Sequence, residues 1–104
     1  MTTEISTNYD KVHRRLERES EAVSRLLKKT TSYRFEPKDY SCFQLLQQLR
    51  IELEELSNQQ QIALTEYNSK GSIADSDIAD IEELSSRFKE LETNMATYLL
   101  RVTS

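Results

Sequence analysis

Two side chains in this sequence could serve as a nucleophile and its base: Cys42 and His13, each the single residue of its type. A thiol becomes a strong nucleophile when a histidine lies within hydrogen-bonding distance, but we expect these two residues at opposite ends of an elongated fold. The sequence also contains no CxxC, HExxH or GxSxG motif and no glycine-rich phosphate loop. It therefore predicts neither an enzyme nor a bound metal or cofactor.

An acidic segment, DSDIAD at residues 75–80, superficially resembles a calcium-binding loop. Such a loop has glycine at its sixth position and glutamate at its twelfth, whereas this one has Asp80 and Ser86 there. Carboxylates near a helix N-terminus are stabilised by the helix dipole, by about 0.3–1 kcal/mol each. We therefore interpret this segment as the start of a helix.

The composition favours a few long helices. One glycine and one proline among 104 residues leave little to separate short elements. No run of 18 apolar residues could span a bilayer, and the first twenty residues hold no apolar run typical of a secretory signal. Because a lone cysteine fits a reducing compartment, we expect a cytoplasmic protein, either free or at the cytosolic face of a membrane.

Apolar residues recur every three or four positions in three segments, which is the heptad spacing of coiled coils. Thr7 followed by Asp10 resembles a capping box, so regular helix should begin near residue 8. Pro37 with Asp39 marks a second helix entry, and Gly71 suits a left-handed C-cap. These signals predict helices over about residues 8–31, 39–70 and 73–103, with a loop at 32–38.

Short connections make neighbouring helices antiparallel. The sequence therefore predicts one all-α domain over residues 1–104, an elongated up-down-up antiparallel three-helix bundle with coiled-coil-like heptad packing. A two-helix hairpin that borrows a helix from a partner is the alternative. The expected core positions are Ile5, Tyr9, Val12, Leu16, Val23 and Leu26; Cys42, Leu46, Leu49, Leu53, Leu56, Gln60, Ala63 and Tyr67; and Ala74, Ile81, Leu84, Phe88, Leu91, Met95, Tyr98 and Val102.

Two polar residues, Glu19 and Gln60, occupy core positions of the heptad pattern. If the first two helices pair so that residue numbers add up to about 73, Gln60 faces His13. We then expect a buried polar layer of His13, Glu19 and Gln60, which fixes the register of the helices. Glu19 should either lie within reach of Arg50 or Arg87 or extend its carboxylate to water at the edge of a narrow core.

Four of the eight aromatic residues, with the single proline and the single cysteine, fall in TSYRFEPKDYSCF, residues 31–43. We expect these rings to fold over the end of the bundle and shield its core from water. The alternative is a docking site, because aromatic residues are frequent interface hot spots. The four residues are Tyr33, Phe35, Tyr40 and Phe43.

Some apolar residues are expected outside the core. Ile51 and Ile62 share one outward stripe of the second helix, eleven residues apart. A stripe of this kind suits a helix from another chain. The candidate partner-binding residues are Ile51, Glu55, Asn58, Ile62 and Leu100, together with Tyr33 and Phe35 in the loop.

Charge is unevenly distributed along the chain. Residues 1–35 hold eight lysines and arginines against five acidic residues, whereas residues 36–104 hold six against thirteen. The positive charge falls on the outer face of the first helix, where it could meet anionic lipid or an acidic partner. The net charge of −4 argues against nucleic acid. We call this surface the basic ridge; it consists of Lys11, Arg14, Arg18, Arg25 and Lys28, with Arg15 and Lys29 alongside.

These features indicate a non-enzymatic protein–protein interaction module, an adaptor, subunit or regulatory domain in a trafficking or cytoskeletal complex. In architecture the chain resembles spectrin-type bundles and the N-terminal regulatory domains of SNARE proteins, although the spectrin tryptophan is absent. One alternative is a small helical chaperone or carrier, similar to tubulin-folding cofactor A or to secretion chaperones. Another is binding to a membrane surface through the basic ridge. The expected partner is another protein, itself helical, in a homo- or hetero-oligomer.

Overall fold

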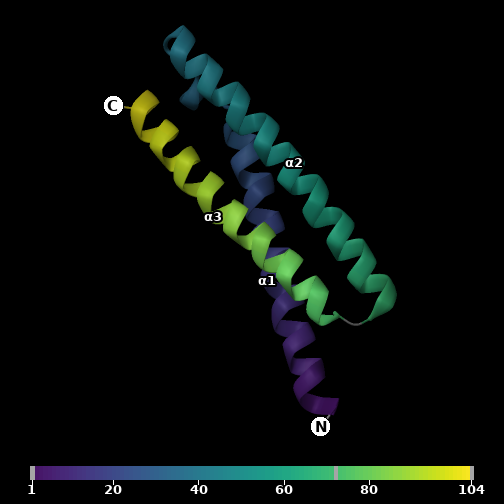
Figure 1. Cartoon of the computed structure of the whole chain (residues 1–104). Helices are drawn as coiled ribbons and strands as arrows, with labels where there is room; N and C mark the ends of the chain where they lie inside the picture. Colours follow the sequence, from purple (N-terminus) through teal and green to yellow (C-terminus); the bar gives the residue numbers. More distant parts are fainter. Residues whose placement is uncertain (1, 72, 104) are drawn as a thin grey trace.

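Three long helices lie side by side in an up-down-up rod of 56 × 20 × 20 Å (Figure 1). The computed structural model describes the backbone of residues 2–71 and 73–103 and the side chains of residues 10–71 and 73–103. Each helix contacts the other two, so the predicted three-helix bundle is confirmed and the hairpin that borrows a partner's helix is wrong. The helices are α1 (Thr2–Lys29), α2 (Tyr40–Lys70) and α3 (Asp75–Thr103).

The first helix differs from its prediction at both ends. It begins at Thr2 rather than near residue 8, so Thr7 and Asp10 lie inside the helix and the expected capping box does not start it. The side chains of Ile5 and Tyr9, both predicted in the core, lie outside the described ones. The helix ends at Lys29, after which three successive backbone bonds from residue i to i−3, starting at Thr30, tighten its last turn.

The second helix begins and ends as the sequence predicts. Asp39 is its N-cap, and its carboxylate accepts a 2.8 Å hydrogen bond from the backbone N–H of Cys42. Gly71 has φ 69°, the left-handed conformation that glycine adopts without steric cost, and its N–H donates to the Tyr67 carbonyl at 2.8 Å. Both caps satisfy backbone groups that a helix end leaves without partners.

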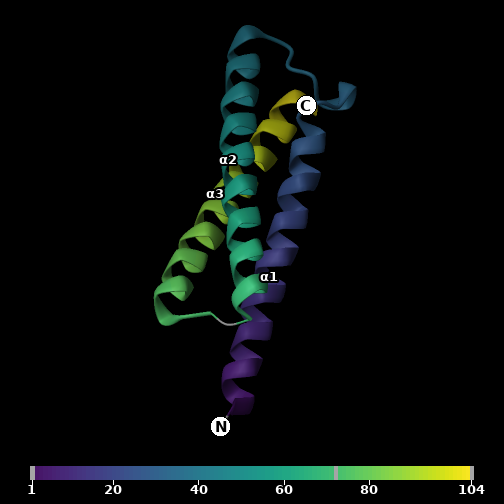
Figure 2. The same ribbon diagram turned by 90° about the vertical axis from the view of Figure 1, so that its right-hand side faces the viewer.

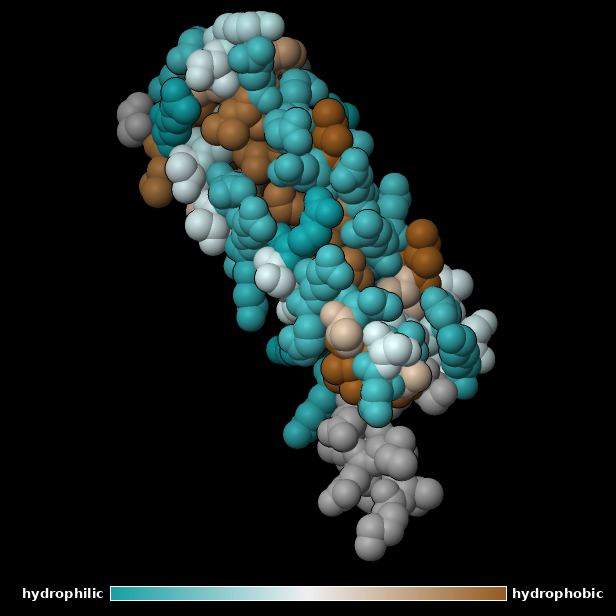
Figure 3. All heavy atoms as spheres, in the orientation of Figure 1, coloured by the Kyte–Doolittle hydropathy of each residue, from teal (hydrophilic) through white to brown (hydrophobic). Residues whose placement is uncertain are grey.

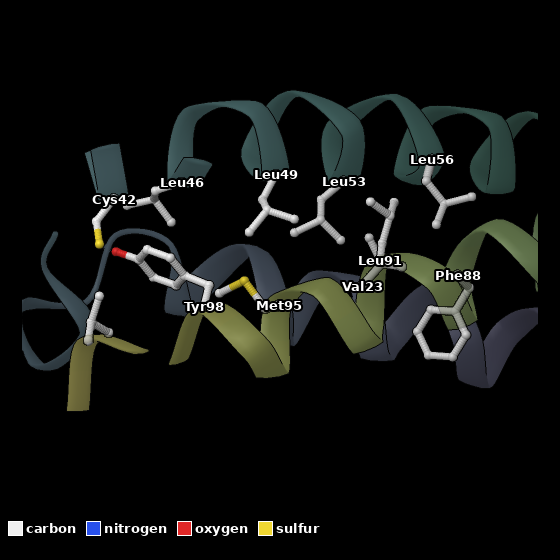
Figure 4. Close-up of a cluster of buried hydrophobic side chains, with 11 residues drawn as sticks. Val23, Cys42, Leu46, Leu49, Leu53, Leu56, Phe88, Leu91, Met95 and Tyr98 are labelled. Atoms are coloured by element: carbon white, nitrogen blue, oxygen red, sulfur yellow. The ribbon is translucent and has the colours of Figure 1, made fainter. Parts of the chain in front are cut away.

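The buried apolar side chains form two separate clusters. Among the described side chains, the large cluster holds eleven buried residues beside the α1–α2 linker, and the small cluster holds four beside the α2–α3 connection. Figure 4 shows the leucines of α2 in the large cluster pointing toward α3. The large cluster is Val23, Cys42, Leu46, Leu49, Leu53, Leu56, Phe88, Leu91, Met95, Tyr98 and Val102; the small one is Leu16, Ala63, Tyr67 and Ile81.

All eight core positions predicted for α2 are buried. On the other helices Val12, Leu26 and Leu84 are only partly buried. Ala74 is exposed, and its prediction as a core residue is wrong, because it precedes α3 and its carbonyl accepts the backbone N–H of Asp77. Heptad spacing therefore identified the buried face of α2 completely and those of α1 and α3 in part.

The linker carries a 3₁₀ turn, η1 (Tyr33–Phe35), and covers the core with one ring instead of four. Phe35 packs against the large cluster, and its carbonyl accepts a 2.8 Å bond from the Tyr98 hydroxyl. Tyr33 is 89% exposed and Tyr40 73% exposed, and the ring of Tyr40 stacks on Phe43, itself 45% exposed. The prediction that all four rings cover the core is wrong, because Tyr33, Tyr40 and Phe43 are exposed.

The pairing of α1 with α2 is displaced from the expected register. The contacts His13–Asn68 and Ser20–Gln61 join residues whose numbers add up to 81 rather than 73. The ten-residue linker rises along the bundle, so α2 begins beyond the end of α1 (Figure 2). A shift of eight residues moves the facing position on α1 by about 12 Å.

Candidate functional site

The two residues with catalytic chemistry lie far apart, as predicted. Cys42 is buried in the first turn of α2, and His13 contacts Asn68 in the last turn. Twenty-six residues of helix between Cys42 and Asn68 span about 39 Å, so no thiol–imidazole pair forms. Among the described residues, no cluster of three or more His, Cys, Asp or Glu side chains could hold a metal ion.

A buried polar layer separates the two apolar clusters. Glu19 is buried there and accepts a 2.6 Å hydrogen bond from the Ser85 hydroxyl, with Arg15 Nε 3.9 Å away. Ser20 accepts a 2.8 Å bond from the side-chain amide of Gln61. Each helix contributes to the layer between its two sets of buried apolar residues. We call Glu19, Ser20, Gln60 and Ser85 the polar layer.

Gln60 is the exception within the polar layer. Its side chain is fully buried, and neither its amide nitrogen nor its amide oxygen has a hydrogen-bond partner in the described part of the chain. A buried polar group without a partner costs about 1–3 kcal/mol. The layer therefore limits the stability of the bundle at this level.

Of the three residues predicted for the layer, Glu19 and Gln60 are buried in it and His13 lies outside it. His13 contacts Asn68 at 2.7 Å and Glu17 at 2.6 Å instead of Gln60, because the register is displaced. Neither arginine predicted to reach Glu19 does so; Arg50 pairs with Glu54 and Arg87 approaches Glu55. Glu19 is not extended to water either, since it is buried.

Sequence reasoning missed both serines of the layer. Ser20 and Ser85 are small and polar, and each looks like a surface residue when its own helix is considered alone. A usable signal was the alignment of interruptions, because Glu19, Gln60 and Ser85 each fall between two groups of apolar residues on their own helix. The layer is therefore a shared feature of three helices.

The basic ridge lies on one exposed face of α1. All five of its residues are exposed, and no ion pair joins them to another described residue. Arg15, predicted alongside the ridge, turns toward α3 and pairs with Glu82 at 2.7 Å. Beside that cation the pKa of the Glu82 carboxyl falls below its usual value. The five residues of the basic ridge are therefore accessible to a partner, but the ridge is narrower than expected because Arg15 is not part of it.

The predicted partner-binding residues fall into three separate regions. Ile51 and Ile62 are 50% and 67% exposed on the outside of α2. Leu100 is 71% exposed near the end of α3. Because Glu55 lies near Arg87 and Ser41 near Arg101, the antiparallel register puts Leu100 level with the start of α2, about 30 Å from Ile62. Tyr33 and Phe35 lie in the linker at that same end.

We call Ile51, Glu55, Asn58 and Ile62 the α2 stripe. All four side chains are exposed, and Glu55 is 3.9 Å from Arg87 across the α2–α3 boundary. This boundary faces the viewer in Figure 3, where brown side chains show between the teal side chains of α3 and α2. The stripe therefore borders a partly apolar surface.

A groove between α2 and α3 opens beside the stripe, near the α2–α3 connection. It has a volume of about 380 Å³, and Ile62 stands on its α2 rim. Its floor is formed by Ala63, Tyr67 and Leu84, residues that belong to the small cluster or pack against it. The remaining lining residues are polar or charged: Gln59, Glu66, Asp77, Asp80, Glu83 and Arg87.

The electrostatics of this α2–α3 groove are negative. Burial raises the pKa of Tyr67, and the nearby carboxylates of Asp77, Glu66 and Asp80 raise it further. Glu66 pairs with Lys70 at 2.7 Å, and Asp77 accepts a hydrogen bond from a backbone N–H at the start of α3. The carboxylates of Asp80 and Glu83 have no cationic partner within 4 Å in the described part of the chain.

Comparison with known proteins assigns no relative: no family model, no curated protein and no solved structure matches this chain. Within residues 2–71 and 73–103, no helix is both long and apolar enough to cross a bilayer.

Proposed function

We propose that this chain is a non-enzymatic protein–protein interaction module, an adaptor, subunit or regulatory domain of a larger cytoplasmic assembly. The α2 stripe is the observation that carries the proposal. Ile51 is 50% exposed and Ile62 is 67% exposed, although their helix α2 already packs against two others. Because the bundle resembles spectrin-type bundles and SNARE regulatory domains in architecture, we propose a trafficking or cytoskeletal complex as the assembly.

The position of the stripe supports this function. Single exposed apolar residues are common and carry little information, but Ile62 also stands on the rim of the apolar-floored α2–α3 groove. A helix laid along two others buries such residues and leaves charged side chains at its edges. The stripe and the groove together therefore provide both the apolar contacts and the shape for a partner.

Purification of the intact tagged chain from its own cells tests this proposal. The double variant Ile51→Glu/Ile62→Glu should keep its helical circular dichroism and lose the proteins that co-purify with the unmodified chain. Leu100→Glu is the matched control, because it puts the same charge on an equally exposed residue at another face. Equal retention, or equal loss, in both variants would contradict the assignment of the stripe.

A second candidate is contact with anionic lipid through the basic ridge. The exposure of all five ridge residues, without ion pairs to described residues, favours it. Each lysine or arginine near an anionic surface contributes about 1 kcal/mol. Flotation with phosphatidylserine vesicles should then occur at low salt and disappear at high salt, since exposed charges are screened.

A further inference from the structure

We propose that the α2–α3 groove binds a basic amphipathic helix from a different protein. This inference rests on the proposed interaction function and names the chemistry of the partner. The occupant presents apolar side chains to the groove floor and lysines or arginines to its acidic rims.

The groove has the shape for a short stretch of helix. Its α2 wall runs from Gln59 to Tyr67, which is about 12 Å or just over two helical turns. The two walls come from antiparallel helices, so a third helix can lie between them and extend the bundle to four. Apolar side chains one turn apart on the occupant would then meet Ile62 and Leu84.

Among the described side chains, the small cluster beneath the groove has fewer buried members than the large one. Four buried residues form it, and the partly buried Val12, Leu64, Ile73 and Leu84 pack against it. An occupant would shield Leu84 and the exposed Ile62 from water, with a gain of about 25 cal/mol for each Å² of apolar surface covered. The apolar side chains of the partner would therefore cover Leu84 and Ile62, beside the smaller of the two clusters.

Charge determines which amphipathic helix fits. Four carboxylates and one guanidinium line the groove, and the pKa of Tyr67 is raised partly by three of those carboxylates. A second acidic helix would be repelled, whereas lysines and arginines on the occupant's flanks would meet Asp80 and Glu83. Complementary charge of this kind selects partners and speeds association.

A second copy of this chain fits the groove poorly. Its basic surface is the ridge on α1, and the outward positions there, 11, 14, 18, 21, 25 and 28, carry no apolar residue. The α1 residues Leu16 and Val23 are buried in the clusters. In Figure 1, α1 lies behind α2 and α3, so ridge and groove occupy opposite faces and their pairing would repeat without closing.

Fluorescence anisotropy with synthetic peptides measures this specificity. The probe is a labelled peptide of about four helical turns, with leucines on one face and lysines on both flanks. Two control peptides keep the length: one has glutamates in place of the lysines, and one has the same composition without the apolar face. Saturable binding of the first peptide alone supports the proposal; equal binding of the scrambled peptide overturns it, because it shows charge attraction without a groove.

Charge reversal on the protein locates the binding. Asp80→Lys/Glu83→Lys should lower the affinity of the protein for the basic peptide by about tenfold or more. Glu90→Lys/Glu92→Lys is the matched control, because it makes the same change in net charge at exposed positions of α3 outside the groove lining. Circular dichroism confirms that both fold. An equal loss of affinity in the two variants would show that the peptide responds to the net charge of the protein and does not bind in this groove.

Photo-cross-linking in the source cells separates failure of this inference from failure of the proposed function. A benzophenone amino acid replaces Ile62 in one variant and Leu100 in another. An adduct at 62 with a basic amphipathic segment of another protein supports both proposals. An adduct there with a second copy or with a non-basic segment, or one at 100 alone, overturns the present inference and leaves the interaction module standing. No adduct at either position overturns both.

Discussion

The two ends of the rod are built differently. Beside the α1–α2 linker, eleven buried residues form one continuous cluster, and η1 closes its end. Beside the α2–α3 connection the small cluster has four buried members among the described side chains, and a polar layer with the unpartnered Gln60 lies between the two clusters. The exposed Ile62 and the acidic α2–α3 groove lie at this second end.

We propose that the two ends differ in role, the large cluster contributing most of the stability and the other end the binding surface. Regions with few buried apolar contacts open most readily, and binding elements are often drawn from them. A partner packed beside the small cluster would add to its apolar contacts. Substitutions in each cluster would show whether the two ends also differ in their contribution to the free energy of unfolding.

The largest expected effect is the loss of a buried leucine from the large cluster. Leu53 is fully buried there, and Leu53→Ala should lower the free energy of unfolding by about 3–5 kcal/mol, through lost burial and the cavity left behind. Ile81→Ala in the small cluster should cost less, about 2–3 kcal/mol, because the groove beside it lets the site collapse. Urea unfolding followed by circular dichroism measures both, and a larger cost at Ile81 would reverse the comparison.

A smaller effect of opposite sign is expected in the polar layer. Gln60→Met keeps the volume and removes two buried polar atoms without partners, so it should stabilise the bundle by about 1–2 kcal/mol. It would also add an apolar contact between the two clusters, both of which the partly buried Leu84 already contacts.

The neighbouring residue is the matched control for this substitution. Gln61→Met removes the amide that donates to Ser20, so it should destabilise by about 0.5–1.5 kcal/mol. Denaturation midpoints of the two variants should therefore move in opposite directions. If both variants lose stability equally, the Gln60 amide has a partner in solution and the layer does not weaken the bundle.

The sequence predicted features within a single helix better than features that join two helices. Heptad spacing predicted every buried position of α2, because burial of a long helix follows directly from its period. Asp39 and Gly71 were predicted because caps need particular side chains and backbone angles. These features are local, and the residues that produce them are adjacent in the chain.

Features that join helices were not predictable in the same way. The register of α1 against α2 depends on how far a ten-residue linker rises, and nothing in its composition sets that distance. The misplacement of His13 followed from this one error. Prediction of the groove needed the relative positions of Ile62 on α2 and Asp80 on α3. Leu100 was grouped with the α2 stripe, although Ile62 in that stripe lies about 30 Å away.

The smallest expected effect concerns the N-cap of α2, Asp39, at the end of the rod that holds the large cluster. The backbone N–H of Cys42 donates to the Asp39 carboxylate and holds its pKa below the ordinary value of 3.8. A carboxyl with a lowered folded-state pKa stabilises the fold above the unfolded pKa, and that contribution disappears as pH falls through the folded one. Asp39→Asn should cap the helix at every pH, because asparagine accepts the same bond without titrating.

The difference in urea midpoint between the unmodified chain and Asp39→Asn therefore isolates this cap from the other carboxylates. Near neutral pH the unmodified chain should be at least as stable as the variant, since the charged carboxylate also favours a helix N-terminus. Below about pH 4 the difference should shrink and then change sign. Because Cys42 belongs to the large cluster, acid would weaken the end that carries most of the stability, and the two ends would become more alike. A difference that stays constant across this range would mean that the carboxylate contributes nothing through its charge.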